Sequence, residues 1–423
     1  MIRQSKQLRH GSRARWAIFS LLIFSTFLSC NDKVESTYTY ITQVPVYLKT
    51  SEVRAMQVGL TSPKAIAATG KIYVYGDYLF ISEPNEGIHV FDNQNPSSPK
   101  KIHFLKIPGS VDMAVNTNIL YADSYVDLLA FDISDIDNIQ LVKRVEDVFP
   151  HMFINTEKSM LVTYKDSIVS YTVPQSDPRL IAFNDAAANF SGGGGWTAGG
   201  QTYGQGGSMA RFTLLKSHLY AVDQSSLRLF DVSQPRSPSF VSDISLGWGI
   251  ETIFPYKDNL FIGSTTGMHI YDASTPSAPV RKSVYQHFTA CDPVVVNDKH
   301  AFVTLRSGNF CQQGVDRLEI LNIEDLSNPV LLKSYEMRNP HGLGLDGNRL
   351  FICEGQYGLK YFNAADVLNI DKNQLEFLQN QKSYDVIPTG KSLIVVGSDG
   401  VSQYDYKSSG NLKKLSTISI GNG

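Results

Sequence analysis

An internal repeat with a base period near 41 residues restricts the folds open to this chain more than any other feature of its sequence. Repeats of 20 to 50 residues indicate a repetitive architecture and have to be found before individual elements are assigned. The repeated unit is a heptapeptide of mainly alternating pattern, and its sixth positions are spaced by 40, 40, 59, 41, 50, 41 and 42 residues. The eight copies are GIHVFDN (87–93), DLLAFDI (127–133), SIVSYTV (167–173), SLRLFDV (226–232), GMHIYDA (267–273), RLEILNI (317–323), GLKYFNA (358–364) and GVSQYDY (400–406).

Each heptapeptide belongs to a module that indicates four β-strands. A short apolar strand precedes it, a turn rich in Pro, Ser and Asn follows, and two β-rich runs lead to the next copy. Such units of about 40 to 45 residues are typical of β-propeller blades, whose radial packing leaves only short sheet edges. We therefore predict an all-β propeller of about eight four-stranded blades, or of seven if the weak third module is not a complete blade. The first strands are expected to start near Lys71, Val111, His151, Met209, Ile250, Asp292, His341 and Asp385.

The Asp or Asn at the sixth position of the repeat has an expected structural role. Its side chain can accept a hydrogen bond from backbone two residues further on and so close an Asx-turn before the proline-bearing loop. We do not interpret it as a catalytic acid. The eight positions are Asp92, Asp132, Thr172, Asp231, Asp272, Asn322, Asn363 and Asp405.

The heptapeptide resembles the third-strand motif of the LVIVD-repeat proteins, a family of exported bacterial proteins expected to be propellers. The resemblance extends over roughly residues 71 to 420, and the third copy departs most from the pattern because it lacks both the acid and the Pro turn. It implies a propeller fold and export. It implies no activity, since the family has no generally established one.

The N-terminus indicates an export signal. Five cationic residues and no acid precede a short apolar run that ends at Ser29-Cys30, which is the layout of a signal peptide and too short to cross a bilayer comfortably. A small residue followed by Cys30, directly after the apolar run, resembles a bacterial lipobox. In a lipobox the cysteine becomes the lipidated N-terminus and holds the protein at a membrane. Phe27 stands where that pattern usually has Leu, so ordinary signal cleavage is the alternative.

This layout predicts four segments. Residues 1–29 are the signal peptide, 30–46 a lipidated tether, 47–70 a linker with a short helix or closing strand, and 71–423 the propeller, with a Gly-rich insertion at 185–208. A second short helical excursion is expected between 364 and 379. The predicted location is the bacterial cell envelope, as an outer membrane lipoprotein that is periplasmic or surface-exposed.

Polar residues at the starts of the innermost strands form the main candidate site. Because these starts lie at one face of a propeller, the side chains are expected to surround the mouth of the central channel, where they could bind a divalent cation such as calcium or a polar ligand. A solvated rim without a ligand is the alternative. The inner set is Asp112, His151, Glu251, Asp292, His341 and Asp385, and an outer set at the ends of second strands is Glu83, Asp123, Asp223, Arg306, Glu354 and Asp399.

Two insertions lengthen the period and belong to the same face. The Gly-rich one carries Trp196 and Tyr203 and is interpreted either as a tolerated loop or as an aromatic lid. The other, at 306–314, brings Cys311 near Cys291, and a disulfide between them is expected in an oxidising compartment. Cys353 is expected to be buried, with a bridge to Cys311 as the alternative.

Composition limits the possible functions. The chain has 38 Lys plus Arg and 40 Asp plus Glu, so it lacks the basic field that nucleic-acid binding requires. No HExxH or GxSxG motif is present. We expect a monomeric, membrane-anchored, non-enzymatic propeller that binds a protein, glycan or other ligand through one loop-rich face, with no certain cofactor. The alternative is a metal-assisted hydrolase, similar to a lactonase or esterase, with its site at the channel mouth.

Overall fold

The structure of this protein is a computed structural model. It describes residues 35–150, 159–174, 205–287, 293–307, 316–408 and 410–421. The chain divides into two compact units, one of Met1–Val46 with Thr163–Gly193 and the other of Tyr47–Val162 with Gly194–Gly423. In the described residues, no helix is both long and apolar enough to cross a membrane.

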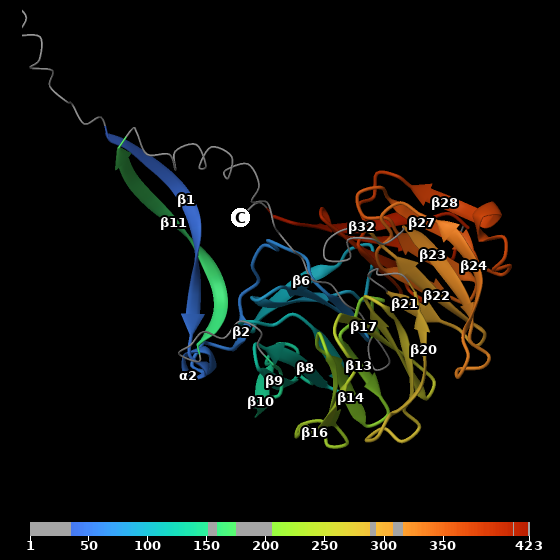
Figure 1. Cartoon of the computed structure of the whole chain (residues 1–423), viewed down its shortest axis with the longest axis horizontal. Coiled ribbons are helices and arrows are strands. Elements are labelled where there is room, and N and C mark those ends of the chain that lie inside the picture. Colours follow the sequence, from blue (N-terminus) through green and yellow to red (C-terminus); the bar gives the residue numbers. More distant parts are fainter. Residues whose placement is uncertain are drawn as a thin grey trace, which may run out of the picture. The chain divides into compact units, whose positions relative to one another are not determined.

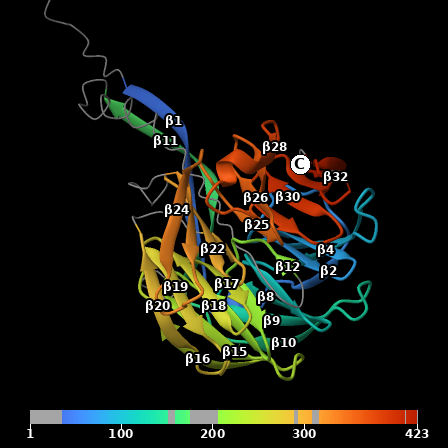
Figure 2. The same cartoon turned by 90° about the vertical axis from the view of Figure 1, so that its right-hand side faces the viewer.

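The second unit is a propeller of seven antiparallel blades with four consecutive strands each, and two further strands extend the sheet of blade 1 to six (Figures 1 and 2). Blade 1 contains β3 (Ile72–Tyr75), β4 (Tyr78–Glu83), β5 (Gly87–Asp92) and β6 (Lys100–Lys106). Blade 2 contains β7 (Met113–Asn116), β8 (Ile119–Ser124), β9 (Asp127–Asp132) and β10 (Gln140–Val145). Blade 3 contains β13 (Phe212–Leu215), β14 (His218–Val222), β15 (Ser226–Asp231) and β16 (Ser239–Ser245).

The remaining four blades follow without interruption by another sheet. Blade 4 contains β17 (Ile250–Tyr256), β18 (Asn259–Ser264), β19 (Gly267–Asp272) and β20 (Val280–Gln286). Blade 5 contains β21 (Val294–Val296), β22 (His300–Leu305), β23 (Arg317–Asn322) and β24 (Val330–Glu336). Blade 6 contains β25 (Leu343–Asp346), β26 (Arg349–Cys353), β27 (Leu359–Asn363), the 3₁₀ turn η1 (Ile370–Asn373) and β28 (Gln374–Leu378). Blade 7 contains β29 (Asp385–Pro388), β30 (Leu393–Gly397), β31 (Gly400–Asp405) and β32 (Lys413–Ser419).

The expectation of eight blades is therefore wrong, and the seven-blade alternative is confirmed. The third module forms no blade: its second and third strands are one continuous strand, β11 (Met160–Pro174), which pairs with β1 (Glu35–Leu48) in a separate two-stranded sheet. Glycines with φ of 146° and 120° begin the third strands of blades 1 and 7, at Gly87 and Gly400, and Gly358 with φ of 131° directly precedes that of blade 6. The third module has Ser167 at this position, but blade 3 forms with Ser226 there and blade 2 with Asp127, so the absence of glycine does not by itself prevent a blade.

The β1–β11 pair is a long ribbon with mostly exposed side chains. Thr39 and Ser170 lie 3.1 Å apart through their hydroxyls, and Gln43 donates to Asp166 at 3.5 Å. The residue numbers rise in one strand as they fall in the other, so the strands are antiparallel. Ile41 and Ile168 are 70% and 72% exposed.

The repeated acid has the predicted structural role in all seven blades. In blade 3, for example, Asp231 accepts a hydrogen bond from the backbone N–H of Ser233 at 2.8 Å. The Asx-turn prediction is thereby confirmed, with Thr172 of the ribbon outside the pattern. The same contact, two residues on, is made by Asp92, Asp132, Asp272, Asn322, Asn363 and Asp405.

The ring closes between blades 7 and 1 by side-chain packing. One buried cluster combines Ile72, Leu79 and Ile81 of blade 1 with Ile387 and Ile394 of blade 7. Beside it, the buried amides of Asn93 and Gln403 exchange hydrogen bonds of 2.7 and 3.2 Å. Because each blade uses consecutive strands, these contacts replace a shared sheet at the closure.

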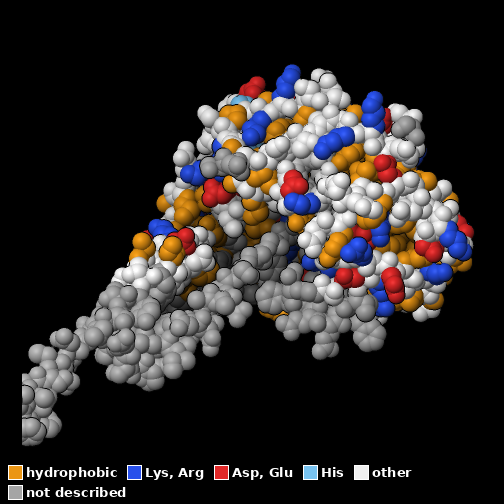
Figure 3. All heavy atoms as spheres, turned by 90° about the horizontal axis from the view of Figure 1, so that it is seen from above, with side chains coloured by type: hydrophobic (Ala, Val, Ile, Leu, Met, Phe, Trp, Pro, Cys, Tyr) orange, Lys and Arg blue, Asp and Glu red, His pale blue; other side chains and the backbone are white. Residues whose placement is uncertain are grey.

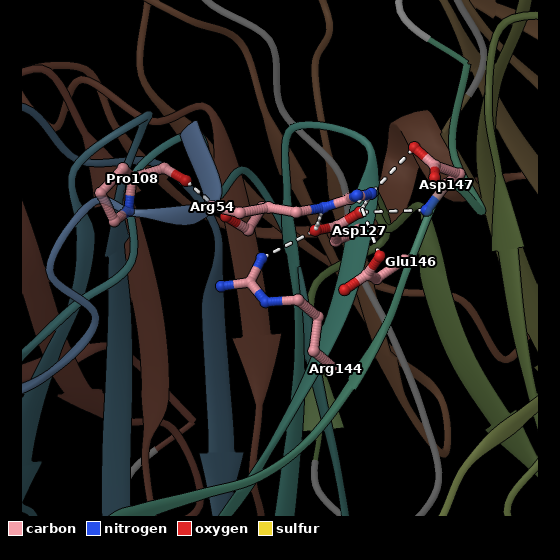
Figure 4. Close-up of polar contacts among 7 residues, drawn as sticks. Arg54, Pro108, Asp127, Arg144, Glu146 and Asp147 are labelled. Carbon is pink, nitrogen blue, oxygen red and sulfur yellow. Dashed lines mark hydrogen bonds and ion pairs between the residues drawn. The ribbon is translucent and has the colours of Figure 1, made fainter. Parts of the chain in front are cut away.

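The segment before blade 1, where a short helix or a closing strand was expected, contains a short helix and a strand. The helix α2 (Thr50–Arg54) precedes β2 (Gly59–Thr61), which adds an outer strand to blade 1. Figure 4 shows how the Arg54 guanidinium binds both oxygens of buried Asp127, at 2.7 and 2.9 Å. Arg144 binds the same carboxylate at 2.7 Å. Burial raises the pKa of Asp127, but these hydrogen bonds outweigh it and leave the pKa below its usual value.

Candidate functional site

A short segment of chain crosses the space enclosed by the inner strands of the propeller. We call this space the hub and residues 205–211 the hub segment. The segment begins as β12 (Gln205–Gly206), which pairs with the innermost strand of blade 1 (Figure 2). It continues into β13 of blade 3, and Ala210 accepts a hydrogen bond from Ile253 of blade 4 at 2.6 Å. Backbone is thus buried at the centre of the ring, where its polar groups need partners.

Asp385 of blade 7 contacts the hub segment from one side. Its carboxylate accepts hydrogen bonds from the backbone N–H of Val386 at 2.9 Å and from the Ser208 hydroxyl at 3.4 Å. The Ser208 hydroxyl in turn accepts from the backbone N–H of Leu343 in blade 6, at 2.8 Å. A Cβ atom at Gly207 would lie 1.7 Å from the nearest Asp385 oxygen, so only glycine can occupy this position.

Asp112 holds the other end of the segment. One carboxylate oxygen accepts from the backbone N–H groups of Arg211 at 2.7 Å and Phe212 at 3.1 Å, and the other accepts from Met113 at 2.7 Å. Asp123 supports this arrangement, because it accepts from the backbone of Val111 and Asp112 at 2.7 and 3.0 Å. Carboxylates that receive several backbone N–H groups are fixed in place.

A buried lysine lies among these acids. The Lys71 ammonium donates to the carbonyl of Met209 at 3.2 Å. Burial lowers the pKa of Lys71 to about 7, although the charges of Asp112 and Asp385 oppose the shift. Burial likewise raises the pKa of Asp385 to about 7 and raises that of Asp112. The group consists of one basic and two acidic side chains around buried backbone, and we interpret it as a structural group that holds the hub segment in place.

A second group of charges involves blades 4 to 6. Burial raises the pKa of Glu251, and the positive charge of Arg306 opposes the shift. Burial and then Arg306 lower the pKa of His341 to about 3, so the imidazole is neutral at physiological pH. The imidazole packs edge-on against Tyr384 at 5.1 Å and lies 3.2 Å from the Asn339 amide.

A polar groove of about 360 Å³ lies between blades 5 and 6 on this face. Its lining residues come from the ends of the loop that links β22 to β23, from the β24–β25 connection and from the β26–β27 turn. They are Ser307, Asp316, Met337, Arg338, Asn339, Gln356 and Tyr357.

The groove is built on two fixed carboxylates. Asp316 accepts from the backbone N–H of Ser307 and of Asn339, both at 2.8 Å. Below it, fully buried Glu354 accepts from the Arg338 backbone at 2.8 Å and from Lys360 at 2.7 Å. The Arg338 guanidinium lies over the Tyr357 ring at 4.4 Å, which positions both side chains at the groove.

The structure links four of the predicted inner rim residues, Asp112, Glu251, His341 and Asp385, through the charges of Lys71, Arg211 and Arg306. Asp112 and Asp385 also contact the hub segment, and a role of these side chains as ligand groups stays a prediction. Glu251, His341 and Arg306 form the second group. His151 and Asp292 lie outside the described residues, as do Trp196, Tyr203, Cys291, Cys311 and the lipidation site Cys30. Cys353 is a buried free thiol, as expected.

The outer set is also divided among blades. Glu83 pairs with Lys64 and His89 at 2.9 and 2.6 Å, and Asp223 pairs with Arg228 at 2.7 Å. Exposed Asp399 pairs with Lys382 at 3.0 Å, Glu354 supports the groove, and Asp123 supports Asp112. Among the residues that the structure describes, no three His, Cys, Asp or Glu side chains gather as metal ligands would.

Sequence reasoning missed several residues that the site depends on. In the sequence, Lys71 marks only the start of a strand and Ser208 only the end of the Gly-rich insertion. Asp316, Arg338 and Tyr357 carry no sequence signal, because they follow no repeat and come from different loops. The presence of Gly-Gly-Ser just before an inner strand was the one available signal for the hub segment, because backbone that approaches other backbone closely favours glycine.

The family comparison concerns one blade. Residues 68–103 match the family model of the LVIVD repeat. This range covers β3 to β5 and the start of β6 in blade 1, so the chain carries an LVIVD repeat and the resemblance is confirmed there. No curated protein matches the chain by sequence.

Several solved structures are similar to this chain. The periplasmic gluconolactonase PpgL of Pseudomonas aeruginosa has a TM-score of 0.53 and 12% identity, over 86% of this chain and 96% of that one. Hsv2 of Kluyveromyces lactis has a TM-score of 0.48 and 12% identity, over 84% and 100%. A protein from Lactobacillus plantarum has 0.49 and 12%, over 78% and 87%. At such identities the likeness to PpgL shows the β-propeller fold alone.

Proposed function

We propose that this protein is a non-enzymatic binding protein of the bacterial cell envelope, and that it binds a hydroxyl-rich ligand such as a glycan in the groove between blades 5 and 6. The observation that carries this proposal is the lining of the groove. It combines a carboxylate, an amide pair, a guanidinium and an aromatic ring within about 360 Å³. Such pockets are specific because a few fixed polar groups set the orientation of the ligand.

The chemistry of the lining suits sugar hydroxyls. A hydroxyl group both donates and accepts hydrogen bonds, and the groove offers acceptors at Asp316 and donors at Arg338, with Asn339 and Gln356 able to do both. Asp316 is already held by backbone N–H groups, and Arg338 is held over Tyr357. Because these side chains are already held in place, little side-chain conformational entropy would be lost on binding, which favours affinity.

The cell-envelope location rests on the N-terminal sequence. Residues 1–29 carry the features of an export signal, and Cys30 stands at the position that is lipidated in lipoproteins. Metabolic labelling with a palmitate analogue tests this part of the proposal. Label is expected on the wild type and absent from Cys30→Ala, whereas a secreted, unlabelled wild-type protein would show ordinary signal cleavage.

A glycan array that includes peptidoglycan fragments and lipopolysaccharide core oligosaccharides tests the ligand class. For any glycan that binds, Arg338→Ala and Tyr357→Ala are each expected to lower affinity at least tenfold, since both remove a fixed group from the groove. The matched control is Arg228→Ala, which breaks the comparable Arg228–Asp223 pair of blade 3. Equal losses in all three variants would contradict a site in this groove.

The second candidate function is hydrolysis, and the group at Glu251, Arg306 and His341 favours it. Arg306 interacts with both Glu251, a carboxyl group with a raised pKa, and His341, a neutral imidazole, and groups of these two kinds can exchange protons with a substrate. Lactone and ester substrates, with and without calcium or zinc, test it. Hydrolysis that is lost in Glu251→Gln would support an enzyme, and hydrolysis that persists in this variant would remove Glu251 from the mechanism.

A further inference from the structure

The hub contains a second cavity, which is distinct in chemistry from the polar groove. Its volume is about 310 Å³, and the inner strands of blades 4 to 7 line it together with Gly207 and Ser208 of the hub segment. Most of the lining side chains are apolar. The main ones are Phe254, Tyr256, Val296, Leu345, Val386 and Pro388.

This cavity exists because the hub segment occupies the hub without filling all of it. Gly207 has no side chain and that of Ser208 is small, and the contact with Asp385 disfavours a larger residue at Gly207. Gly344 also lines the cavity, and a Cβ atom there would meet Pro388 at 2.7 Å. Close backbone approach therefore requires residues that leave space, and apolar side chains bound this space together with polar groups such as Ser208 and Asn297.

Two pairs of opposite charge lie beside the cavity, and the first is Asp385, which contacts the lining residues Gly207 and Ser208, with Lys71. Tyr256 and Asn297 line the cavity, and the turns that follow them carry Lys257 and Asp298, which are paired at 2.5 Å. The Tyr256 hydroxyl also donates to Asp298, at 2.5 Å. Since these charges cancel, the surroundings of the cavity favour neither an anion nor a cation.

We propose that this cavity is a binding site for a small, uncharged, largely apolar molecule of about two or three rings. A dry apolar cavity of roughly 150 Å³ accepts benzene, and this one is about twice that size. Pockets of about 300 Å³ and above that have apolar walls and few polar groups are typical ligand sites. The site is independent of the polar groove, because the two share no lining residue.

The neutral fluorescent molecule N-phenyl-1-naphthylamine tests the proposal with the purified protein. Its emission rises in apolar surroundings, and saturable binding of one molecule per chain is expected. Val296→Trp should weaken this binding at least tenfold, because the indole would fill the cavity. Val280→Trp is the matched control, since Val280 is 64% exposed on an outer strand, and it should bind as the wild type does.

A second variant keeps the test informative if Val296→Trp does not fold. Leu345→Phe enlarges a half-buried lining residue, and it should weaken binding about threefold or more while the protein still unfolds cooperatively. Arg338→Ala, which alters only the polar groove, should leave binding unchanged, so failure of this proposal and failure of the glycan proposal can be told apart. Emission that does not saturate, or affinities equal in the wild type and both filled variants, would overturn the proposal.

Discussion

The second and third modules of the repeat are similar in sequence and end in different structures. Both contain an apolar strand followed by a heptapeptide of alternating pattern, yet the second becomes blade 2 and the third becomes a ribbon strand followed by the hub segment. The second module has the Asx-turn at Asp132, whereas the third has Thr172 at that position. The comparison teaches that turn residues, more than apolar alternation, decide whether a module folds as a blade.

The hub segment gives the third module a structural role that no other module has. Asp112, Asp385 and Lys71 come from three different blade boundaries, and each forms a hydrogen bond with this segment. The excursion after blade 2 therefore returns through the centre of the ring. Deletions and substitutions at this segment should therefore destabilise the propeller more than comparable changes elsewhere.

Two deletions should distinguish the contribution of the Gly-rich insertion to thermal stability from that of the hub segment. Removal of residues 189–203 is expected to leave the melting temperature nearly unchanged. Removal of residues 189–208 also deletes the β12 pairing and the Ser208 contacts, and it should lower the melting temperature by roughly 10 °C or prevent folding. Thermal unfolding followed by circular dichroism measures both. Equal melting temperatures would show that the hub segment is dispensable.

Gly207→Val should be strongly destabilising. Its Cβ atom would overlap the buried Asp385 carboxylate, and the strain should cost about 3 to 5 kcal/mol in the free energy of unfolding. Urea denaturation measures this cost. The control is Gly76→Asn, because Gly76 has φ of 59° with no atom within 4 Å of the added Cβ, and Asn tolerates this conformation. A cost below about 1 kcal/mol at Gly207 would contradict the close contact.

Substitution of two hydrogen-bond acceptors compares how much the hub and a repeated turn each contribute to stability. Asp112→Ala leaves the backbone N–H groups of Arg211 and Phe212 without their acceptor inside the hub, and it should cost about 3 kcal/mol. Asn363→Ala removes one exposed Asx-turn contact with Ala365, and it should cost roughly 0.5 to 1 kcal/mol. Chemical denaturation of both variants measures the difference. Similar costs would mean that Asp112 is less important than its contacts indicate.

The buried acid Asp385 should make stability depend on pH. Its pKa is about 7 in the folded protein and near 3.8 when unfolded, so the folded state holds a proton that the unfolded state loses between these values. Its contribution to stability is therefore complete below about pH 4 and is lost as the pH rises toward 7. Asp385→Asn should reduce this decrease by about 2 kcal/mol. Unfolding free energies at pH 4.5 and 7.5 provide the measurement, and parallel pH profiles would argue against a protonated Asp385.

The strands of the blades could be predicted from the sequence because their signals are local. The alternation in GMHIYDA and its turn identify β19 and its neighbour, and the same pattern locates every blade that formed. The short helix at Thr50–Arg54 and the excursion at Ile370–Asn373 were also expected. The third module differs from the others because it lacks both the acid and the Pro turn, and the seven-blade alternative rested on this weakness.

The candidate sites were predicted less well, because position on a strand does not determine what fills the space in front of it. Asp112 and Asp385 do lie at the starts of inner strands, but both are buried and hydrogen-bonded to the segment that enters the hub. Arg338 lies in the β24–β25 connection and Tyr357 in the β26–β27 turn, and their side chains meet in the folded protein. No spacing in the sequence indicates that contact.

The repeating four-stranded unit, its turns and the conformation of each strand can be derived from the amino-acid sequence, since they depend on residues a few positions apart. The number of blades, the path of the chain through the hub and the use of its buried charges become clear only in the folded protein. The physical reason is that the close contacts of Gly207 and the acceptors for Arg211 and Phe212 exist only when segments more than 90 residues apart come together.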